Sequence, residues 1–129
     1  MRKYVWILFA TFIISSCVKP GEEKITSLPP VDFQQKLKET SDAILLDVRT
    51  LEEVNTGRLK NEINFDFKTK EFDLLIKGLD KTKPYFVYCA SGVRSGMAAD
   101  KMKDEGFEKI YVLEGGIKAW EAKGLPVQK

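Results

Sequence analysis

From about residue 30 onwards, compact runs of apolar residues alternate with segments in which apolar residues recur at helical spacing. The compact runs predict buried strands, which we place at 43–48, 63–67, 85–88 and 110–113. Helical spacing and glycine stops predict helices, which we place at 31–40, 52–57, 71–79, 95–105 and 117–123. Strands that alternate with helices at this interval predict an α/β fold with a central parallel sheet flanked by helices on both faces.

The first seventeen residues have a different pattern, which is typical of an export signal. Arg2 and Lys3 precede a mostly apolar run over 4–14, which is shorter than the about 20 residues of a transmembrane helix and fits a signal peptide. The run ends at Ile14, and Ser15, Ser16 and Cys17 follow it; these four residues resemble the lipobox of bacterial lipoproteins. The resemblance implies a signal peptide over 1–16 and lipidation of Cys17 as the mature N-terminus. An ordinary secretory signal with a chance cysteine is the alternative.

After the predicted signal peptide, the sequence predicts a tether and a single domain. Residues 17–29 are rich in Lys, Glu, Pro and Gly without apolar periodicity, so we expect a flexible link. Residues 30–129 are enough for one domain of ordinary size. We therefore expect a protein of the bacterial cell envelope that is lipid-anchored to a membrane at Cys17, with its domain outside the cytoplasm.

Composition narrows the chemistry that this domain can perform. The chain contains no histidine, which excludes Ser-His-Asp and Cys-His catalysis and His-ligated zinc. Its two cysteines, Cys17 and Cys89, do not form a C-x-x-C pair, so we expect neither a disulfide scaffold nor a metal site. Without 1–16, the chain has 19 basic and 19 acidic residues and lacks the basic excess of a nucleic-acid binder. We expect no nucleic-acid partner, no cofactor and a monomer.

The candidate nucleophile is Cys89, which stands at the carboxyl end of the predicted strand 85–88. In open parallel sheets, ligands bind at this edge. The residues that follow are Ala90, Ser91, Gly92, Val93, Arg94 and Ser95. Such a small, glycine-containing loop can direct its N–H groups inward, and with the next helix N-terminus it would form an anion-binding concavity that lowers a thiol pKa. Cys89 is therefore expected to react as a thiolate; a buried structural cysteine is the alternative.

Four segments together resemble single-domain rhodaneses, a family of sulfurtransferases. They are Leu46-Asp47-Val48-Arg49 with Glu52-Glu53, the loop from Tyr88 to Ser95, Gly106-Phe107, and Leu113-Glu114-Gly115-Gly116 with Trp120 and Gly124-Leu125-Pro126. Each motif alone is weak, whereas four in the right order and spacing are specific. The match spans about residues 30–127, and it implies a single rhodanese-like domain.

The resemblance also implies a reaction cycle. Cys89 would attack the outer sulfur of a small donor such as thiosulfate or polysulfide, form a persulfide, and pass the sulfur to a nucleophilic acceptor such as a thiol or cyanide. The loop N–H groups over 90–95 would stabilise the negative sulfur, and Arg94 would attract a dianionic donor. The loop from Cys89 to Arg94 is one residue shorter than in phosphatases and arsenate reductases of this fold, so we rank phosphatase activity below sulfur transfer.

Some residues of these motifs permit two interpretations. Arg49 could position donor or acceptor, and we keep it as a candidate substrate-binding residue, although a structural ion pair at the strand end is the favoured interpretation. Glu52 and Glu53 are interpreted as a solvated helix start, and Trp120 as a core anchor. Where the family carries Gly-His-Ile-Pro-Gly-Ala, this chain has Arg58 in place of the histidine and lacks the proline and second glycine. We expect this to change stability or local charge more than chemistry.

Two other functions compete with a turnover enzyme. The first is a non-turnover persulfide carrier or binding module of the envelope, which would use the same loop. The second is an interaction domain with an incidental cysteine, which the intact loop argues against.

Overall fold

The computed structural model describes residues 23–129. The predicted signal peptide and the predicted lipidation site at Cys17 lie outside this part of the chain, so both stay predictions. The elements are β1 (Ile25–Leu28), α1 (Pro30–Glu39), β2 (Ile44–Asp47), α2 (Leu51–Thr56), β3 (Ile63–Asn64), α3 (Phe72–Lys77), β4 (Pro84–Tyr88), α4 (Val93–Asp104), β5 (Lys109–Leu113) and α5 (Gly116–Ala122).

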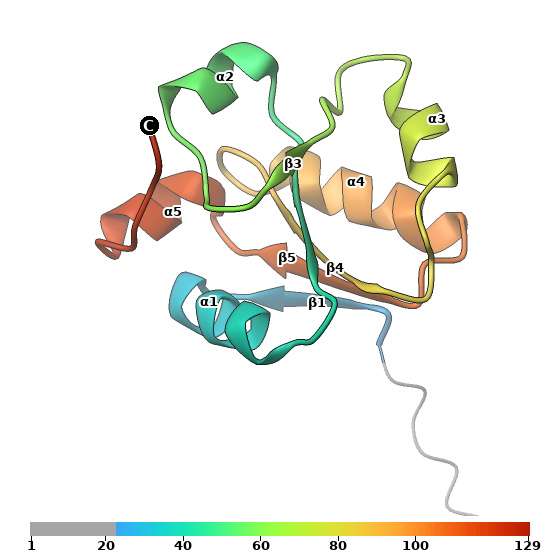
Figure 1. Ribbon diagram of the computed structural model, residues 1–129, viewed down its shortest axis with the longest axis horizontal. Helices are drawn as coiled ribbons and strands as arrows, with labels where there is room; N and C mark the ends of the chain where they lie inside the picture. The colour runs from blue at the N-terminus through green and yellow to red at the C-terminus, as the bar shows by residue number, and fades with distance from the viewer. Residues whose placement is uncertain (1–22) are drawn as a thin grey trace, which may run out of the picture.

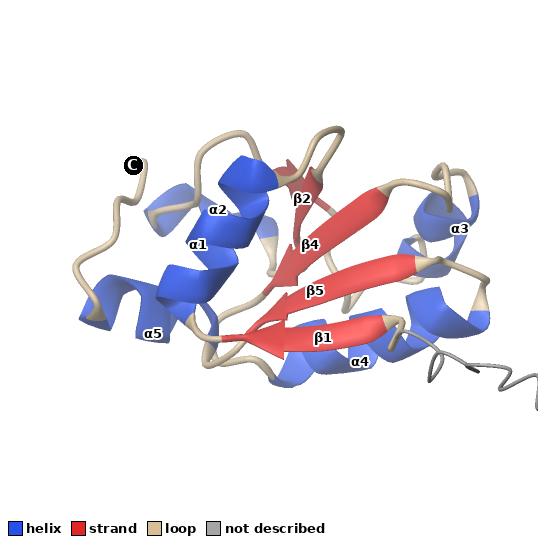
Figure 2. Cartoon of the chain, turned by 90° about the horizontal axis from the view of Figure 1, so that it is seen from below, coloured by secondary structure: helices blue, strands red, loops and turns tan. Residues whose placement is uncertain are grey.

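The five strands form one sheet in the order β1-β5-β4-β2-β3, and every neighbouring pair is parallel. Helices α1 and α5 cover one face of the sheet, and α3 and α4 cover the other (Figure 2). The strands β4 and β5 lie in the middle of the molecule, with β1 at an edge (Figure 1). The predicted α/β fold with helices on both faces is therefore confirmed.

Side chains of β4 show how the sheet divides the core into two layers. Tyr85 and Val87 pack with α3 and α4, whereas Phe86 and Tyr88 pack with α1 and α5, because successive residues of a strand point to opposite faces. Trp120 of α5 is buried in the second layer, and its indole N–H donates to the Pro126 carbonyl at 3.0 Å. The prediction that Trp120 is a core anchor is confirmed.

The strand β1 corrects the predicted tether. Ile25–Leu28 lies within 17–29, but it pairs in parallel with β5, from Ile25 beside Ile110 to Leu28 beside Leu113. This four-residue edge strand is too short to show a periodicity in the sequence, and its backbone hydrogen bonds to β5 decide its conformation. The folded domain therefore begins before residue 30.

The segment that departs from the family pattern is hydrogen-bonded to the C-terminal residues of the chain. Arg58 exchanges backbone hydrogen bonds with Gln128 at 2.8 and 2.7 Å, and its guanidinium approaches Glu62 at 3.5 Å. Burial, followed by the nearby negative charge of Asp47, raises the pKa of Glu62. The predicted strand over 63–67 shortens to Ile63–Asn64, although the N–H groups of Phe65 and Phe67 still donate to the carbonyls of Asp47 and Val48 at 2.9 and 3.2 Å.

Candidate active site

The thiol of Cys89 lies directly after β4, at the carboxyl end of a central strand. The residue is 1% exposed. Its Sγ accepts a hydrogen bond from the Gly92 N–H at 3.0 Å and lies 3.3 Å from the Ser95 hydroxyl oxygen. That hydroxyl also reaches the Gly92 carbonyl at 3.2 Å. The loop therefore curls around the sulfur, as its sequence predicts.

Two opposing effects act on the Cys89 thiol. Burial raises its pKa, whereas hydrogen bonds from the Ser95 hydroxyl, the Ser95 N–H and the N–H groups of Gly92 and Ser91 lower it, and together they leave the pKa below its usual value. These donors stabilise the thiolate more than they stabilise the thiol. The hydrogen-bond donors around Sγ, which we call the cradle, thus favour the thiolate form of Cys89 without any histidine.

The backbone of the loop is held from behind by the start of α5. The carbonyls of Cys89 and Ala90 accept hydrogen bonds from the N–H groups of Ile117 and Lys118 at 2.9 and 3.1 Å. These carbonyls face α5, which leaves loop N–H groups to face the sulfur. Gly116 has φ +63°, and a Cβ there would overlap the Ala90 carbonyl. Only glycine permits this approach, which explains the glycine at the first position of α5.

The helix α4 begins at Val93, two residues before the predicted start at Ser95. Gly92, with φ +101°, turns the chain into the helix, so Val93 and Arg94 belong to its first turn. Val93 is exposed, Ser91 is exposed and Ala90 is half-buried at the mouth of the loop. The structure therefore brings six predicted loop residues around Cys89, and it places them partly in a helix because the glycine turn ends the loop early.

Arg94 does not present a free charge to the mouth of the site. Its guanidinium donates to both oxygens of Glu53 in α2, at 2.8 and 2.7 Å. Glu53 is therefore more than the solvated helix start that the sequence suggested, and it links the segments that follow β2 and β4. One of the two interactions of Glu53 has a sequence pattern: Thr50 and Glu53 have the spacing of a capping box, which the structure contains. The partner 41 residues away has no sequence signature.

Arg49 is buried, at 3% exposed, and its guanidinium is engaged inside the protein. It contacts both carboxylate oxygens of Asp47, with the shortest contact at 2.7 Å, and donates to the carbonyls of Gly57 and Glu53 at 2.7 and 3.3 Å. It also lies 5.5 Å from the centre of the Tyr88 ring. The structural interpretation fits this geometry, whereas a direct contact between Arg49 and a donor would require these bonds to break.

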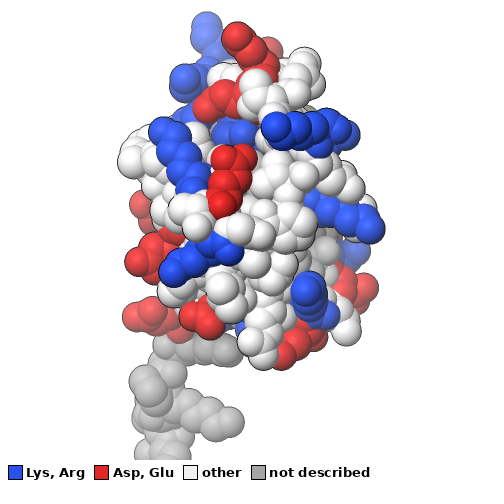
Figure 3. All heavy atoms as spheres, turned by 90° about the vertical axis from the view of Figure 1, so that its left-hand side faces the viewer, with Lys and Arg blue, Asp and Glu red and all other residues white. Residues whose placement is uncertain are grey.

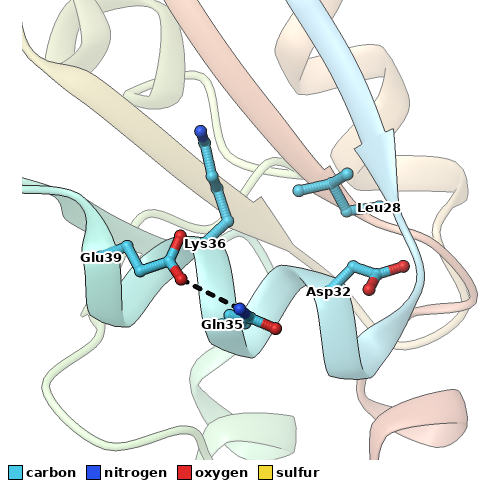
Figure 4. Close-up of a pocket in the computed structure, with 5 residues that line it drawn as sticks. All are labelled: Leu28, Asp32, Gln35, Lys36 and Glu39. Carbon is cyan, nitrogen blue, oxygen red and sulfur yellow. Dashed lines mark hydrogen bonds between the residues drawn. The ribbon is translucent and has the colours of Figure 1, made fainter.

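Other hollows of the described surface lie away from the cysteine loop. One of about 180 Å³ lies between the end of β1 and α1 and is lined by Leu28, Asp32, Gln35, Lys36 and Glu39 (Figure 4). Its polar side chains are partly paired with one another, since Gln35 donates to Glu39 at 3.0 Å. None of these residues belongs to the loop at 89–95.

Basic and acidic residues balance over the part of the chain that the structure describes. Three of the 21 basic residues and one of the 19 acidic residues lie at 1–22, which leaves 18 of each in residues 23–129. On the side toward which the strands point, Lys and Arg are interspersed with Asp and Glu (Figure 3). Within residues 23–129 there is no cluster of three or more His, Cys, Asp or Glu side chains suited to a metal ion, and no helix long and apolar enough to cross a membrane.

A buried cysteine whose Sγ accepts a backbone N–H at the carboxyl end of a central parallel strand defines an α/β domain with a cysteine loop. The sequence model described as "Rhodanese-like domain" matches residues 30–123. The chain therefore belongs to the rhodanese-like family. A solved structure of a rhodanese-related protein from Thermoplasma volcanium agrees, with 33% identity and a TM-score of 0.69, over 79% of this chain and 96% of that one.

Two curated relatives show the range of proteins that carry this domain. A protein named sulfurtransferase from Allochromatium vinosum is 27% identical over 103 residues, which are 80% of this chain and 94% of the relative. A tRNA uridine(34) hydroxylase from Cytophaga hutchinsonii is 35% identical over 103 residues, which are 78% of this chain. The chain spans only 33% of that relative's length, so the similarity concerns one domain of a larger protein.

Proposed function

We propose that this protein is a sulfurtransferase that carries sulfane sulfur on Cys89. The observation that carries the proposal is the cradle: a buried Sγ that accepts the Gly92 N–H at 3.0 Å, lies 3.3 Å from the Ser95 hydroxyl and has a lowered pKa. The match covers 94% of the protein named sulfurtransferase, and this similarity supports the same reaction class.

The proposed reaction has two transfers. The Cys89 thiolate attacks the outer sulfur of a donor such as thiosulfate or polysulfide; the S–S bond of the donor breaks, and its electron pair leaves with the remaining group, which is sulfite when the donor is thiosulfate. A thiol or cyanide then attacks the outer sulfur of the Cys89 persulfide and restores the thiolate. No external oxidant or reductant is consumed in either transfer.

The loop is suited to both forms of the cysteine. Its N–H groups stabilise negative charge on Sγ of the thiolate. In the persulfide the charge lies on the outer sulfur, one atom further out, and the same donors can stabilise it there. A persulfide carrier that waits for a partner protein would need the same cradle, so we retain this as the alternative. The hydroxylase relatives act on tRNA by name, but the balanced charge of residues 23–129 gives no support to a nucleic-acid substrate here.

We also propose that the domain is a monomer in the cell envelope, anchored through a lipid on Cys17. The support for the anchor is the sequence pattern of residues 1–17. In the producing bacterium, Cys17→Ser should move the protein from the membrane fraction to a soluble fraction. Retention of this variant in the membrane would contradict the anchor.

The test of the proposed function is mass spectrometry after brief exposure to thiosulfate or polysulfide, with Cys89→Ser as the matched variant. We expect one additional sulfur atom on the peptide that contains Cys89, removed by cyanide and absent from Cys89→Ser. Repeated turnover with an acceptor would identify an enzyme, and loading without turnover would identify the carrier. If neither donor loads Cys89, the proposal is wrong.

A further inference from the structure

Arg94 is the one basic residue of the loop from Cys89 to Ser95, and its charge is already paired. The guanidinium donates to both carboxylate oxygens of Glu53, at 2.8 and 2.7 Å. A guanidinium binds a carboxylate or another oxyanion through the same planar pair of N–H groups. The Nη1/Nη2 edge of Arg94, one of the two edges through which a guanidinium can hold the oxygens of a donor, is therefore occupied by Glu53.

Glu53 is held in this position by its own helix. One of its carboxylate oxygens accepts the Thr50 N–H at 2.9 Å and the Thr50 hydroxyl at 3.0 Å, while the Glu53 N–H donates to that hydroxyl at 3.3 Å. The hydrogen bonds from Arg94, opposed by burial and assisted by Thr50, hold the pKa of the Glu53 carboxyl well below its usual range. Glu53 therefore stays ionised, and moving it away from Arg94 would disturb the N-terminal cap of α2.

The surroundings of Arg94 contain further negative charge. The hydrogen bond to Glu53 is the largest cause of the raised pKa of Arg94, partial burial opposes it, and the charges of Glu53, Cys89 and Asp66 add to it. One guanidinium thus lies near two carboxylates and the thiolate. A dianion that approaches Cys89 meets like charges with no unpaired loop cation to offset them.

Building on the sulfurtransferase activity proposed above, we propose that Glu53 is a positioning and specificity-determining residue. It fixes Arg94 and cancels its charge, so that the site takes sulfur from the persulfide of a small thiol in preference to dianionic thiosulfate. In this transfer the Cys89 thiolate attacks the terminal sulfur of R–S–SH, the S–S bond breaks, and its electron pair leaves as the thiolate RS⁻. The proton of the donor stays with the new persulfide, so charge and electrons balance.

The first experiment measures charge selection at Cys89 without any sulfur chemistry. The full chain is alkylated with anionic iodoacetate and with neutral iodoacetamide at low salt, and modification is read on the peptide that contains Cys89, because Cys17 is also a cysteine. Glu53→Gln keeps the capping geometry and removes the charge. Its ratio of iodoacetate rate to iodoacetamide rate should rise about fivefold, and the rise should shrink in about 1 M salt, where the screening length is about 3 Å.

The matched control is Glu52→Gln, because Glu52 lies beside Glu53 in α2 and is exposed. This variant should leave the ratio unchanged. In the double variant Glu53→Gln/Arg94→Gln the rise should disappear, since the liberated guanidinium is its cause. An unchanged ratio in Glu53→Gln, or an equal rise in Glu52→Gln, would overturn the proposal.

The second experiment tests the donor preference itself. Rates of sulfur loading are compared for thiosulfate and for the persulfide of a neutral thiol such as 2-mercaptoethanol. The wild type should react faster with the persulfide, and Glu53→Gln should accelerate thiosulfate about fivefold while changing the persulfide rate by less than about twofold. Equal changes for both donors would indicate a merely structural role. If the wild type accepts sulfur from neither donor, the sulfurtransferase function fails, whereas the alkylation ratio still decides the electrostatic role of Glu53.

Discussion

Two arginine–carboxylate pairs follow the neighbouring strands β2 and β4, and they differ in how far their charges are removed from water. In the Asp47–Arg49 pair the side chains are 0% and 4% exposed, and carbonyls of Gly57 and Glu53 accept two further guanidinium N–H groups. In the Glu53–Arg94 pair they are 34% and 16% exposed. Both pairs are bidentate, yet the first is part of the core and the second borders the loop of Cys89.

The difference shows that burial, more than distance, separates a structural ion pair from one that can influence a ligand. Removing one partner of a buried pair leaves an uncompensated charge in the core, which is costly. Removing one partner of a half-exposed pair leaves a charge that water can solvate, which costs little stability but changes the field at the mouth of the site. The following predictions test this contrast, from the largest effect to the smallest.

Asp47→Asn should have the largest effect. The substitution leaves the Arg49 guanidinium buried without its counter-charge and should lower the free energy of unfolding by about 3–5 kcal/mol. Urea denaturation followed by circular dichroism measures this. The double variant Asp47→Asn/Arg49→Met should regain part of the loss, because it removes the orphaned charge. A cost below about 1 kcal/mol would mean that this pair behaves like the exposed one.

Gly116→Ala should destabilise the loop that begins at Cys89 and Ala90. Its Cβ would overlap the Ala90 carbonyl at a φ of +63°, whereas Gly124 has a similar φ of +70° with open space around it. We expect Gly116→Ala to cost about 2 kcal/mol or more, and the matched Gly124→Ala to cost about 1 kcal/mol from backbone strain alone. Thermal unfolding compares the two variants. Equal losses would show that α5 does not press on the cysteine loop.

Ser95→Ala should change reactivity more than stability. The variant removes the hydroxyl that lies 3.3 Å from Sγ, which is the largest of the effects that lower the pKa of Cys89. The pKa should therefore rise, and the pH profile of alkylation by iodoacetamide should move to higher pH, with a several-fold slower rate at neutral pH. Ser41→Ala, in an exposed turn, is the control. A profile that stays in place would show that backbone N–H groups alone set the thiol pKa.

Glu53→Gln should have the smallest effect on stability, below about 1 kcal/mol, because the pair is partly exposed. The pKa of this carboxyl is lowered in the folded state, so its contribution is present above the unfolded-state pKa of about 4.3 and is lost as the pH falls toward the folded-state pKa. The stability difference between wild type and variant should therefore be largest near neutral pH and shrink below about pH 4. A difference that grows in acid would contradict this sign.

Much of the fold could be predicted because its central strands correspond to continuous apolar runs in the sequence. The runs at 85–88 and 110–113 lie within one residue of β4 and β5, since buried parallel strands are continuously apolar. The strand β1 could not be predicted, because Ile25–Leu28 gains its conformation from pairing with a strand more than 80 residues later. The same limit applies to the site: the loop around Cys89 is contiguous in sequence, whereas Glu53 reaches Arg94 only in the folded chain.

The sequence by itself determined the loop that surrounds Cys89 and the alternation of strands and helices, because each depends on neighbouring residues and their backbone preferences. Only the tertiary structure decided which charges remain available. It buried Arg49 against Asp47 and paired Arg94 with Glu53, since the carboxyl ends of β2 and β4 meet at one edge of the sheet. Electrostatic interactions depend on distance and burial in space, and neither of these can be read from positions along the chain.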